Sequence, residues 1–248
     1  MGNLEYSFDN ILKSYIDTGT PLPERQINII ASNRGMLKTY LRKRINTVND
    51  IIYDDLRTNE FYLLEKYFSD SKLFKDYVSN LSSISYTSKR LTSLPDWFGN
   101  LTNLKELDLY GNKLENLPDW FDNLKNLRKL GLGSNQLTTL PKVIGNLKNL
   151  TGLNLSYNEL TTLPDWIGNI KNLDRLELAD NQLTTLPDSI GNLTKLEIFD
   201  LNYNKLTTLP DWIVNFKNLK YLILSGNQLS DEEQERIKKL LPNTDIYF

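Results

Sequence analysis

The chain of 248 residues contains no cysteine and no histidine. These absences exclude disulfide bonds, thiolate or imidazole ligands for a metal, cysteine nucleophiles and the usual histidine general base. Lack of cysteine is also typical of a reducing compartment. We therefore expect no catalytic residues, no metal site and no cofactor.

The sequence also lacks a large excess of charge of either sign and long apolar runs. The 29 Lys and Arg residues nearly balance the 31 Asp and Glu residues, leaving a net charge of −2 and no global field that would attract nucleic acid. No apolar run has membrane-spanning length, and the first residues lack the basic and apolar regions of a secretory signal. We expect no nucleic-acid partner, no membrane insertion and a cytoplasmic location, with non-classical export left open.

Residues 1–82 carry no repeat, and their apolar residues recur at helical spacing. This pattern predicts a small all-α region, which serves as a cap or as an accessory domain. The basic cluster from Lys38 to Arg44 is interpreted as a solvated helix face, because Lys and Arg balance Asp and Glu over residues 1–82. Residues 83–90 are expected to form a degenerate first strand that joins this region to the repeats.

Residues 91–228 repeat one 23-residue pattern six times without insertion or deletion, beginning with LTSLPDWFGNLTNLKELDLYGNK. Each copy has seven apolar positions, and all 42 of these positions are apolar. One such unit cannot bury its own apolar face, so the copies must stack on one another. The last segment, 229–248, is expected to cap the stack with a helix whose start is acidic and whose end is basic.

The stretch from Leu104 to Leu114, LKELDLYGNKL, fits the pattern LxxLxLxxNxL. On this pattern residues 91–228 resemble the leucine-rich repeat superfamily, in the 23-residue class of Ras-group, scaffold and many bacterial proteins. The resemblance implies an α/β solenoid, a horseshoe with a parallel sheet on its concave face, and it implies protein binding rather than catalysis. The recurrent asparagine, Asn112 in the first copy, is expected to bond to turn backbone.

The outward positions of the expected strands differ most between copies, so they are the surface free to encode a partner. Apolar and aromatic residues ringed by charge, as in an interface core with a polar rim, gather toward the last copies. The candidate partner-binding residues are Arg175, Glu177, Ile198, Asp200, Tyr221, Ile223, Tyr157, Tyr203, Glu106, Asp108, Tyr110 and Lys129.

Four tryptophans, Trp97, Trp120, Trp166 and Trp212, recur at one phase of the repeat after Leu-Pro-Asp. Their rings either anchor a partner along one flank of the solenoid or pack on the neighbouring turn.

The sequence as a whole predicts a monomeric, non-enzymatic module that binds a protein or peptide on the concave face. Two alternatives stay open. In one, the helical region carries an enzymatic or effector activity and the repeats select its substrate. In the other, the chain is an effector or immunity-type binding protein.

Overall fold

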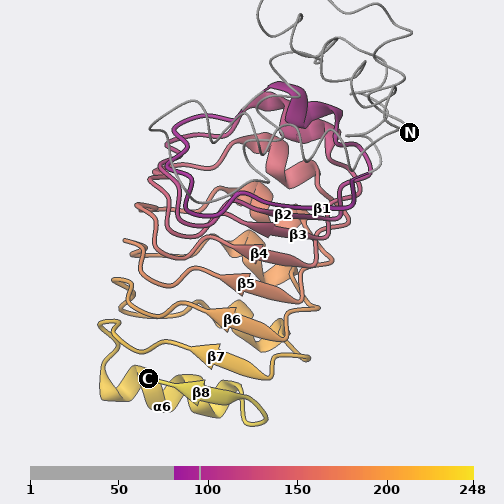
Figure 1. The fold of residues 1–248 in the computed structure, drawn as a ribbon. Helices are drawn as coiled ribbons and strands as arrows, with labels where there is room; N and C mark the ends of the chain where they lie inside the picture. The colour runs from indigo at the N-terminus through magenta and orange to yellow at the C-terminus, as the bar shows by residue number, and fades with distance from the viewer. Residues whose placement is uncertain (1–80, 95) are drawn as a thin grey trace, which may run out of the picture. The chain divides into compact units, whose positions relative to one another are not determined.

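The computed structural model describes residues 81–94 and 96–248, drawn in colour in Figure 1. The expectations for residues 1–82 and for the basic cluster at Lys38–Arg44 lie outside these described residues, apart from residues 81 and 82. Within the described part, no helix is long and apolar enough to cross a membrane.

Eight short strands form one parallel sheet in the order of the sequence. Each strand of the repeat pairs with the next at an offset of one copy, so that Leu107 lies beside Leu130 and Leu130 beside Leu153. The strands are β1 (Ser83–Ser85), β2 (Glu106–Asp108), β3 (Lys129–Gly131), β4 (Gly152–Asn154), β5 (Arg175–Glu177), β6 (Ile198–Asp200), β7 (Tyr221–Ile223) and β8 (Asp245–Tyr247).

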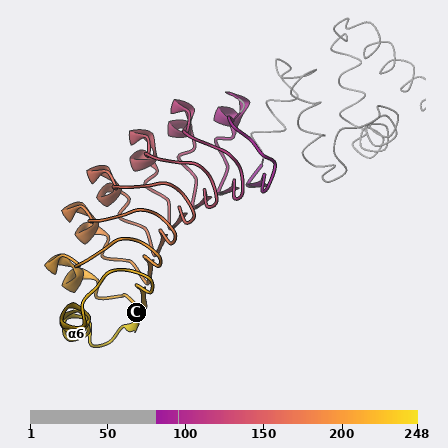
Figure 2. The ribbon, with the colours of Figure 1, turned by 90° about the vertical axis from the view of Figure 1, so that its left-hand side faces the viewer.

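Short 3-10 helices return the chain on the opposite side. They are η1 (Asp96–Asn100), η2 (Asp119–Asn123), η3 (Lys142–Asn146), η4 (Asp165–Asn169), η5 (Asp188–Asn192) and η6 (Asp211–Asn215). From η2 onward a proline in an extended backbone conformation directly precedes each helix. Its ring fixes the φ angle at the point where the chain enters the helix. The helices fan out along the convex side of the arc while the strands line its inner side (Figure 2). The predicted solenoid with a parallel sheet is confirmed.

The repeat positions fill the space between these two layers. Of the 42 apolar positions, 41 are buried, and Leu91 in the first copy is half-buried. The middle residue of every repeat strand, such as Leu107 or Phe199, is almost fully excluded from water. Because side chains alternate along a strand, the residues before and after that middle residue face outward on the concave side.

The recurrent asparagines form a ladder within the turns, as expected. Asn158 is typical: its side-chain carbonyl accepts from the backbone N–H of Leu137 at 3.0 Å, and its amide donates to the carbonyls of Leu132 and Leu155, both at 3.0 Å. Each asparagine thereby ties its own copy to the copy before it. These bonds satisfy backbone groups that the turn leaves without strand partners.

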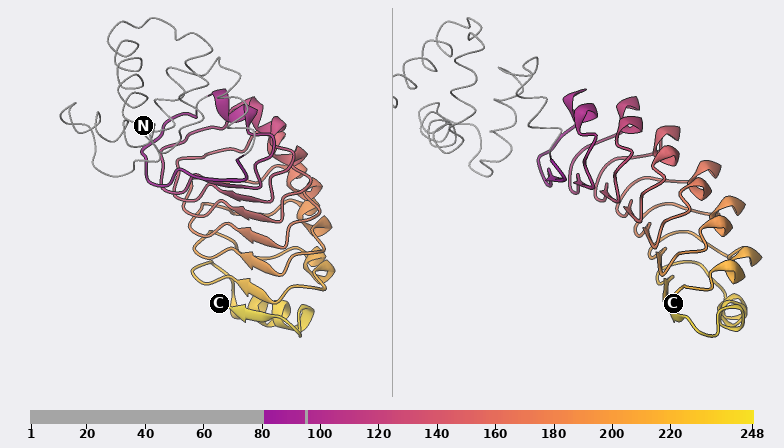
Figure 3. Two further views of the ribbon diagram at one scale, coloured as in Figure 1. Left: turned by 45° about the vertical axis from the view of Figure 1, so that its right-hand side comes forward. Right: turned by 90° about the vertical axis from the view of Figure 1, so that its right-hand side faces the viewer.

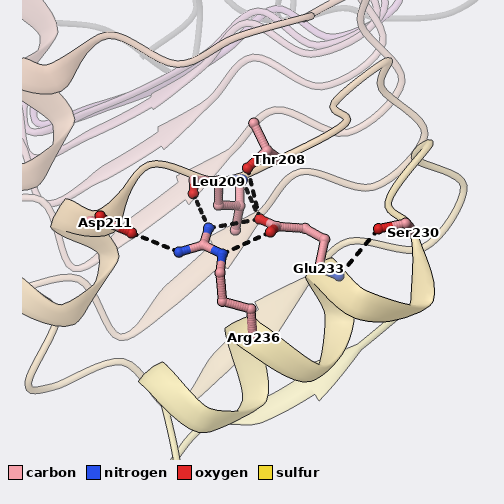
Figure 4. Close-up of polar contacts among 6 residues, drawn as sticks. All are labelled: Thr208, Leu209, Asp211, Ser230, Glu233 and Arg236. Carbon is pink, nitrogen blue, oxygen red and sulfur yellow. Dashed lines mark hydrogen bonds and ion pairs between the residues drawn. The ribbon is translucent and has the colours of Figure 1, made fainter.

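The C-terminal helix α6 (Asp231–Leu240) covers the last repeat, with Ile237 fully buried. Arg236 holds it in place (Figure 4). Its guanidinium donates to Glu233 and to Asp211, each at 2.7 Å, and to the carbonyl of Leu209. Glu233 also accepts from the backbone N–H of Leu209 at 2.8 Å. The Arg236 guanidinium, outweighing the effect of burial, lowers the pKa of Glu233 to about 2.

Candidate partner-binding face

The outward residues of the strands form two columns across the concave face. One column contains the first residue of each strand and the other contains the third, because neighbouring strands pair in register. Nine of the predicted partner-binding residues lie in these columns: Glu106, Asp108, Lys129, Arg175, Glu177, Ile198, Asp200, Tyr221 and Ile223. Figure 3 shows the strands from two further sides.

These nine residues fall into two groups. Glu106, Asp108 and Lys129 lie on β2 and β3, and the remaining six lie on β5, β6 and β7. Between the groups is β4, whose outward residues are Gly152 and Asn154. The structure therefore places the predicted residues on one face but in two separate clusters.

Ion pairs occupy most basic groups on the face. Lys129 lies 3.1 Å from Glu106 on the neighbouring strand, and Arg175 lies 2.6 Å from Glu177 on its own strand. Lys220, just before β7, lies 2.6 Å from Glu197, and this hydrogen bond raises the pKa of Lys220. These cations are already partnered before any ligand arrives.

An apolar patch crosses the last three strands. It consists of Ile198 on β6, Tyr221 and Ile223 on β7, and Tyr247 on β8. Ile198 pairs in register with Tyr221, and Ile223 pairs with Tyr247. Tyr221 is 40% exposed and Tyr247 is 51% exposed. Four apolar side chains on three adjacent strands thus form one open surface.

Sequence reasoning missed Tyr247, because residues 229–248 were expected to form a helical cap alone. The segment Asp245–Tyr247 instead adds an eighth strand to the sheet. The sequence did contain a signal for this strand. Ile246 is apolar and lies between Asp245 and Tyr247, which is the alternation of a half-buried strand.

Asp200 lies beside this apolar patch, in register with Ile223. Burial raises the pKa of its carboxyl group. The nearby carboxylates of Glu177 and Asp180 act in the same direction, whereas the backbone N–H of Asn202, donating at 3.0 Å, and the charge of Arg175 oppose it. Asp200 is therefore a half-buried acid that forms no ion pair within residues 81–94 and 96–248.

The predicted tyrosines Tyr110, Tyr157 and Tyr203 lie just after the strands and border the face. Tyr157 and Tyr203 have φ angles of 57° and 49°, in the left-handed region that glycine occupies at Gly111 and Gly226. They are 52% and 58% exposed. A side chain larger than asparagine is uncommon in this conformation, so two exposed tyrosines are held there against local preference.

The tryptophans pack against the neighbouring copy. A Cβ added to Gly145 would lie 2.9 Å from the Trp166 ring, and one added to Gly191 would lie 2.8 Å from Cβ of Trp212. Each of these tryptophans fills the space left by the glycine of the preceding 3-10 helix. The packing interpretation thus accounts for their fixed phase, and they lie on the convex side, away from the tyrosines.

Within residues 81–94 and 96–248, no group of three or more acidic side chains is arranged to hold a metal ion. Apart from Gly131, Gly152 and Asn154, the outward strand residues of the repeats are tyrosine, isoleucine and charged side chains. Such residues can make apolar and electrostatic contacts with another macromolecule.

The sequence matches the family model of the leucine-rich repeat over residues 79–137, 132–183 and 171–229. This chain belongs to the leucine-rich repeat family. No curated protein matches it. The match covers more than half of the chain and agrees with the sheet described above.

Solved structures with the same repeat are similar to this leucine-rich repeat chain. A leucine-rich repeat protein of Leptospira interrogans is 39% identical, with a TM-score of 0.59, and the match covers 70% of this chain and 51% of that one. The ectodomain of the plant receptor kinase GASSHO1/SCHENGEN3 from Arabidopsis thaliana, in complex with CASPARIAN STRIP INTEGRITY FACTOR 2, is 31% identical, with a TM-score of 0.55. A TDR receptor is 34% identical, with a TM-score of 0.56.

The match covers 62% of this chain and 20% of the GASSHO1/SCHENGEN3 ectodomain, and 63% of this chain and 28% of the TDR receptor. This chain therefore spans about half the length of the Leptospira protein and less of the two receptors. The leucine-rich repeat fold is a common protein-interaction module.

Proposed function

We propose that this protein is a non-enzymatic interaction module that binds a protein or peptide on the concave face, over β5 to β8. One observation carries the proposal. All five large apolar or aromatic side chains that the described residues strongly expose lie on this face or at its border: Tyr110, Tyr157, Tyr203, Tyr221 and Tyr247.

Single exposed apolar residues are normal on any protein, but a contiguous group rimmed by polar residues marks an interaction site. Tyr221 and Tyr247 form such a group with Ile198 and Ile223 on three adjacent strands. Tyrosine is enriched at the centres of interfaces, because it buries a large area with few rotatable bonds. The complex of the GASSHO1/SCHENGEN3 ectodomain, similar in fold, with CASPARIAN STRIP INTEGRITY FACTOR 2 supports a binding role for this chain.

The test begins with a random dodecapeptide library displayed on phage, selected against the full chain. Enriched peptides are synthesised, and their affinities are measured by fluorescence anisotropy. Replacing both Ile198 and Tyr221 by alanine is expected to weaken binding about tenfold or more, since truncation of buried anchors costs above 1 kcal/mol each.

The matched control is the double substitution Asp122→Ala and Lys125→Ala, which removes an exposed ion pair at η2, away from the concave face. It should change the affinity less than about twofold, because exposed ion pairs contribute little. Equal affinity of the wild type and the Ile198/Tyr221 variant, with equal melting temperatures, would place the binding site elsewhere.

A further inference from the structure

The concave face is divided by charge along its length. The count for each strand includes the residue before it, the strand itself and the three residues after it. On this count β2 to β4 carry three basic and two acidic residues: Lys105, Arg128 and Lys129, and Glu106 and Asp108. On β5 to β8 the balance reverses. Six carboxylates stand against two cations there, a net charge of −4: Asp174, Glu177, Asp180, Glu197, Asp200 and Asp245 against Arg175 and Lys220.

Both cations of the acidic half form ion pairs within the molecule. Arg175 and Lys220 are paired with Glu177 and Glu197, each at 2.6 Å. Within the part of the chain that the structure describes, the other four carboxylates form no ion pair: Asp174, Asp180, Asp200 and Asp245. Two of these four, Asp200 and Asp245, lie in register with Ile223 and Tyr221 of the apolar patch.

Asp180 lies between Tyr157 and Tyr203, two of the three tyrosines that border the face. The parallel hydrogen-bond ladder continues past the strand ends to these residues, since the N–H of Tyr157 donates to the carbonyl of Ala179 and that of Asp180 to the carbonyl of Asn202, both at 2.8 Å. Adjacent strands are about 4.8 Å apart, so the backbones of Tyr157 and Tyr203 are about 10 Å apart with Asp180 midway. A cationic side chain there could contact both the carboxylate and an aromatic ring.

We propose that the partner of this face is a protein segment in which lysine or arginine side chains alternate with aliphatic or aromatic ones. The apolar side chains would lie on Ile198, Tyr221, Ile223 and Tyr247, and the cations would meet Asp180, Asp200 and Asp245. This inference rests on the proposed function and adds the chemistry of the partner. The half-burial of Asp200 supports it, because a partly desolvated carboxylate that forms no ion pair among the described residues gains most from a direct cationic contact.

The same feature favours one orientation for a partner whose charge differs between its two ends. The N-terminal half of the face has a net charge of +1 and the C-terminal half −4, so we expect the more basic end of the segment over β5 to β8.

The experiment uses the peptides selected against the full chain, because a random library samples every combination of charged and apolar side chains. Enriched peptides are expected to carry a net positive charge with interspersed apolar residues, relative to the unselected library. The double substitution Asp180→Asn and Asp200→Asn should weaken their binding about fivefold or more. It should also flatten the dependence of affinity on NaCl between about 50 and 200 mM.

The matched control is the double substitution Asp119→Asn and Asp165→Asn. Both side chains are exposed at the start of η2 and η4, on the convex side, and form no ion pair among the described residues. This variant removes the same two charges and should leave the affinity within about twofold of the wild type. Circular dichroism melting of both variants confirms that the solenoid is intact.

Two results separate this inference from the proposed function. Enriched peptides without basic bias, weakened by the Ile198/Tyr221 variant and not by the Asp180/Asp200 variant, would overturn the inference and leave the concave binding site standing. Peptides that are insensitive to both variants, or no enrichment at all, would overturn both.

Discussion

Asp200 is the residue whose ionisation bears most directly on the face. A carboxylate whose pKa is raised by burial opposes folding once it is ionised, so its destabilising effect grows as the pH rises from its ordinary pKa of 3.8 through the raised value. Asp200→Asn should therefore raise the melting temperature at pH 7 and leave it unchanged near pH 3. Thermal melting at both pH values measures this.

Asparagine is a fair replacement at this position, because Asn154 holds the same column on β4. Its side-chain oxygen accepts from the backbone N–H of Ser156 at 2.9 Å, as Asp200 accepts from Asn202. A fall in the melting temperature of the Asp200→Asn variant at pH 7 would mean that the carboxylate has a cationic partner in the free protein.

Tyr157 is expected to contribute to binding while its strained backbone conformation destabilises the fold. Its left-handed backbone costs a non-glycine residue roughly 1 kcal/mol, and asparagine tolerates this region better. Tyr157→Asn should therefore keep or raise the free energy of unfolding, by up to about 1 kcal/mol, while it weakens the binding of selected peptides. Urea unfolding measures the stability of the variant, and fluorescence anisotropy measures its affinity for the selected peptides. A clear loss of stability would show that the tyrosine ring stabilises the fold.

At the scale of the element, the asparagine ladder joins copy to copy. Asn158→Ala would leave the buried N–H of Leu137 unsatisfied, whereas the carbonyls of Leu132 and Leu155 would keep the amide donors of Asn135 and Asn181. An unsatisfied buried group costs about 1 to 3 kcal/mol, so the loss should lie in that range in urea unfolding.

Asn227→Ala is the control for the ladder. Asn227 makes the same contacts in the last copy but is only partly buried, so water can replace its hydrogen bonds. Its loss should be clearly smaller. Equal losses at the two positions would argue against burial as the origin of the effect.

Helix α6 depends on the ionised form of Glu233. Because its pKa falls from an ordinary 4.5 to about 2 on folding, its contribution is complete above pH 4.5 and is lost as the pH falls toward 2. Glu233→Gln should cost about 2 kcal/mol at pH 7 and little at pH 2, as measured by urea unfolding.

Glu235→Gln tests the same charge change on the exposed side of the helix. Among the described residues Glu235 forms one ion pair, with Lys238 at 2.7 Å, and both side chains are more than half exposed. Its loss should be small at every pH. A comparable loss in the two variants would mean that overall helix charge, and not the contact with Leu209 and Arg236, holds the cap.

The fold was predictable wherever the repeat recurs. Six copies of one pattern specify the buried leucines and Asn112 and its equivalents independently of any local propensity, since the copies must stack in register. β8 was not predictable in this way, because Asp245–Tyr247 occurs once and follows a helix in place of a repeat.

The candidate site was predictable only as a face. Alternation along the strands identified which residues point outward, and Ile198, Tyr221 and Ile223 do lie together. The pairing of Arg175 with Glu177 depends on side-chain conformations that a pattern does not specify. Asp180 was overlooked because its position lies beyond the strand, where only the backbone ladder shows that it falls between two tyrosines.

For the whole molecule, the central claim is that a partner covers the concave face at its C-terminal half. Hydroxyl-radical footprinting of the full chain, with and without a selected peptide, reads the exposure of each aromatic side chain by mass spectrometry. We expect several-fold protection of Tyr157, Tyr203, Tyr221 and Tyr247, and unchanged oxidation of Trp120, Trp166 and Trp212 on the convex side. Protection of the tryptophans with unchanged tyrosines would contradict the claim.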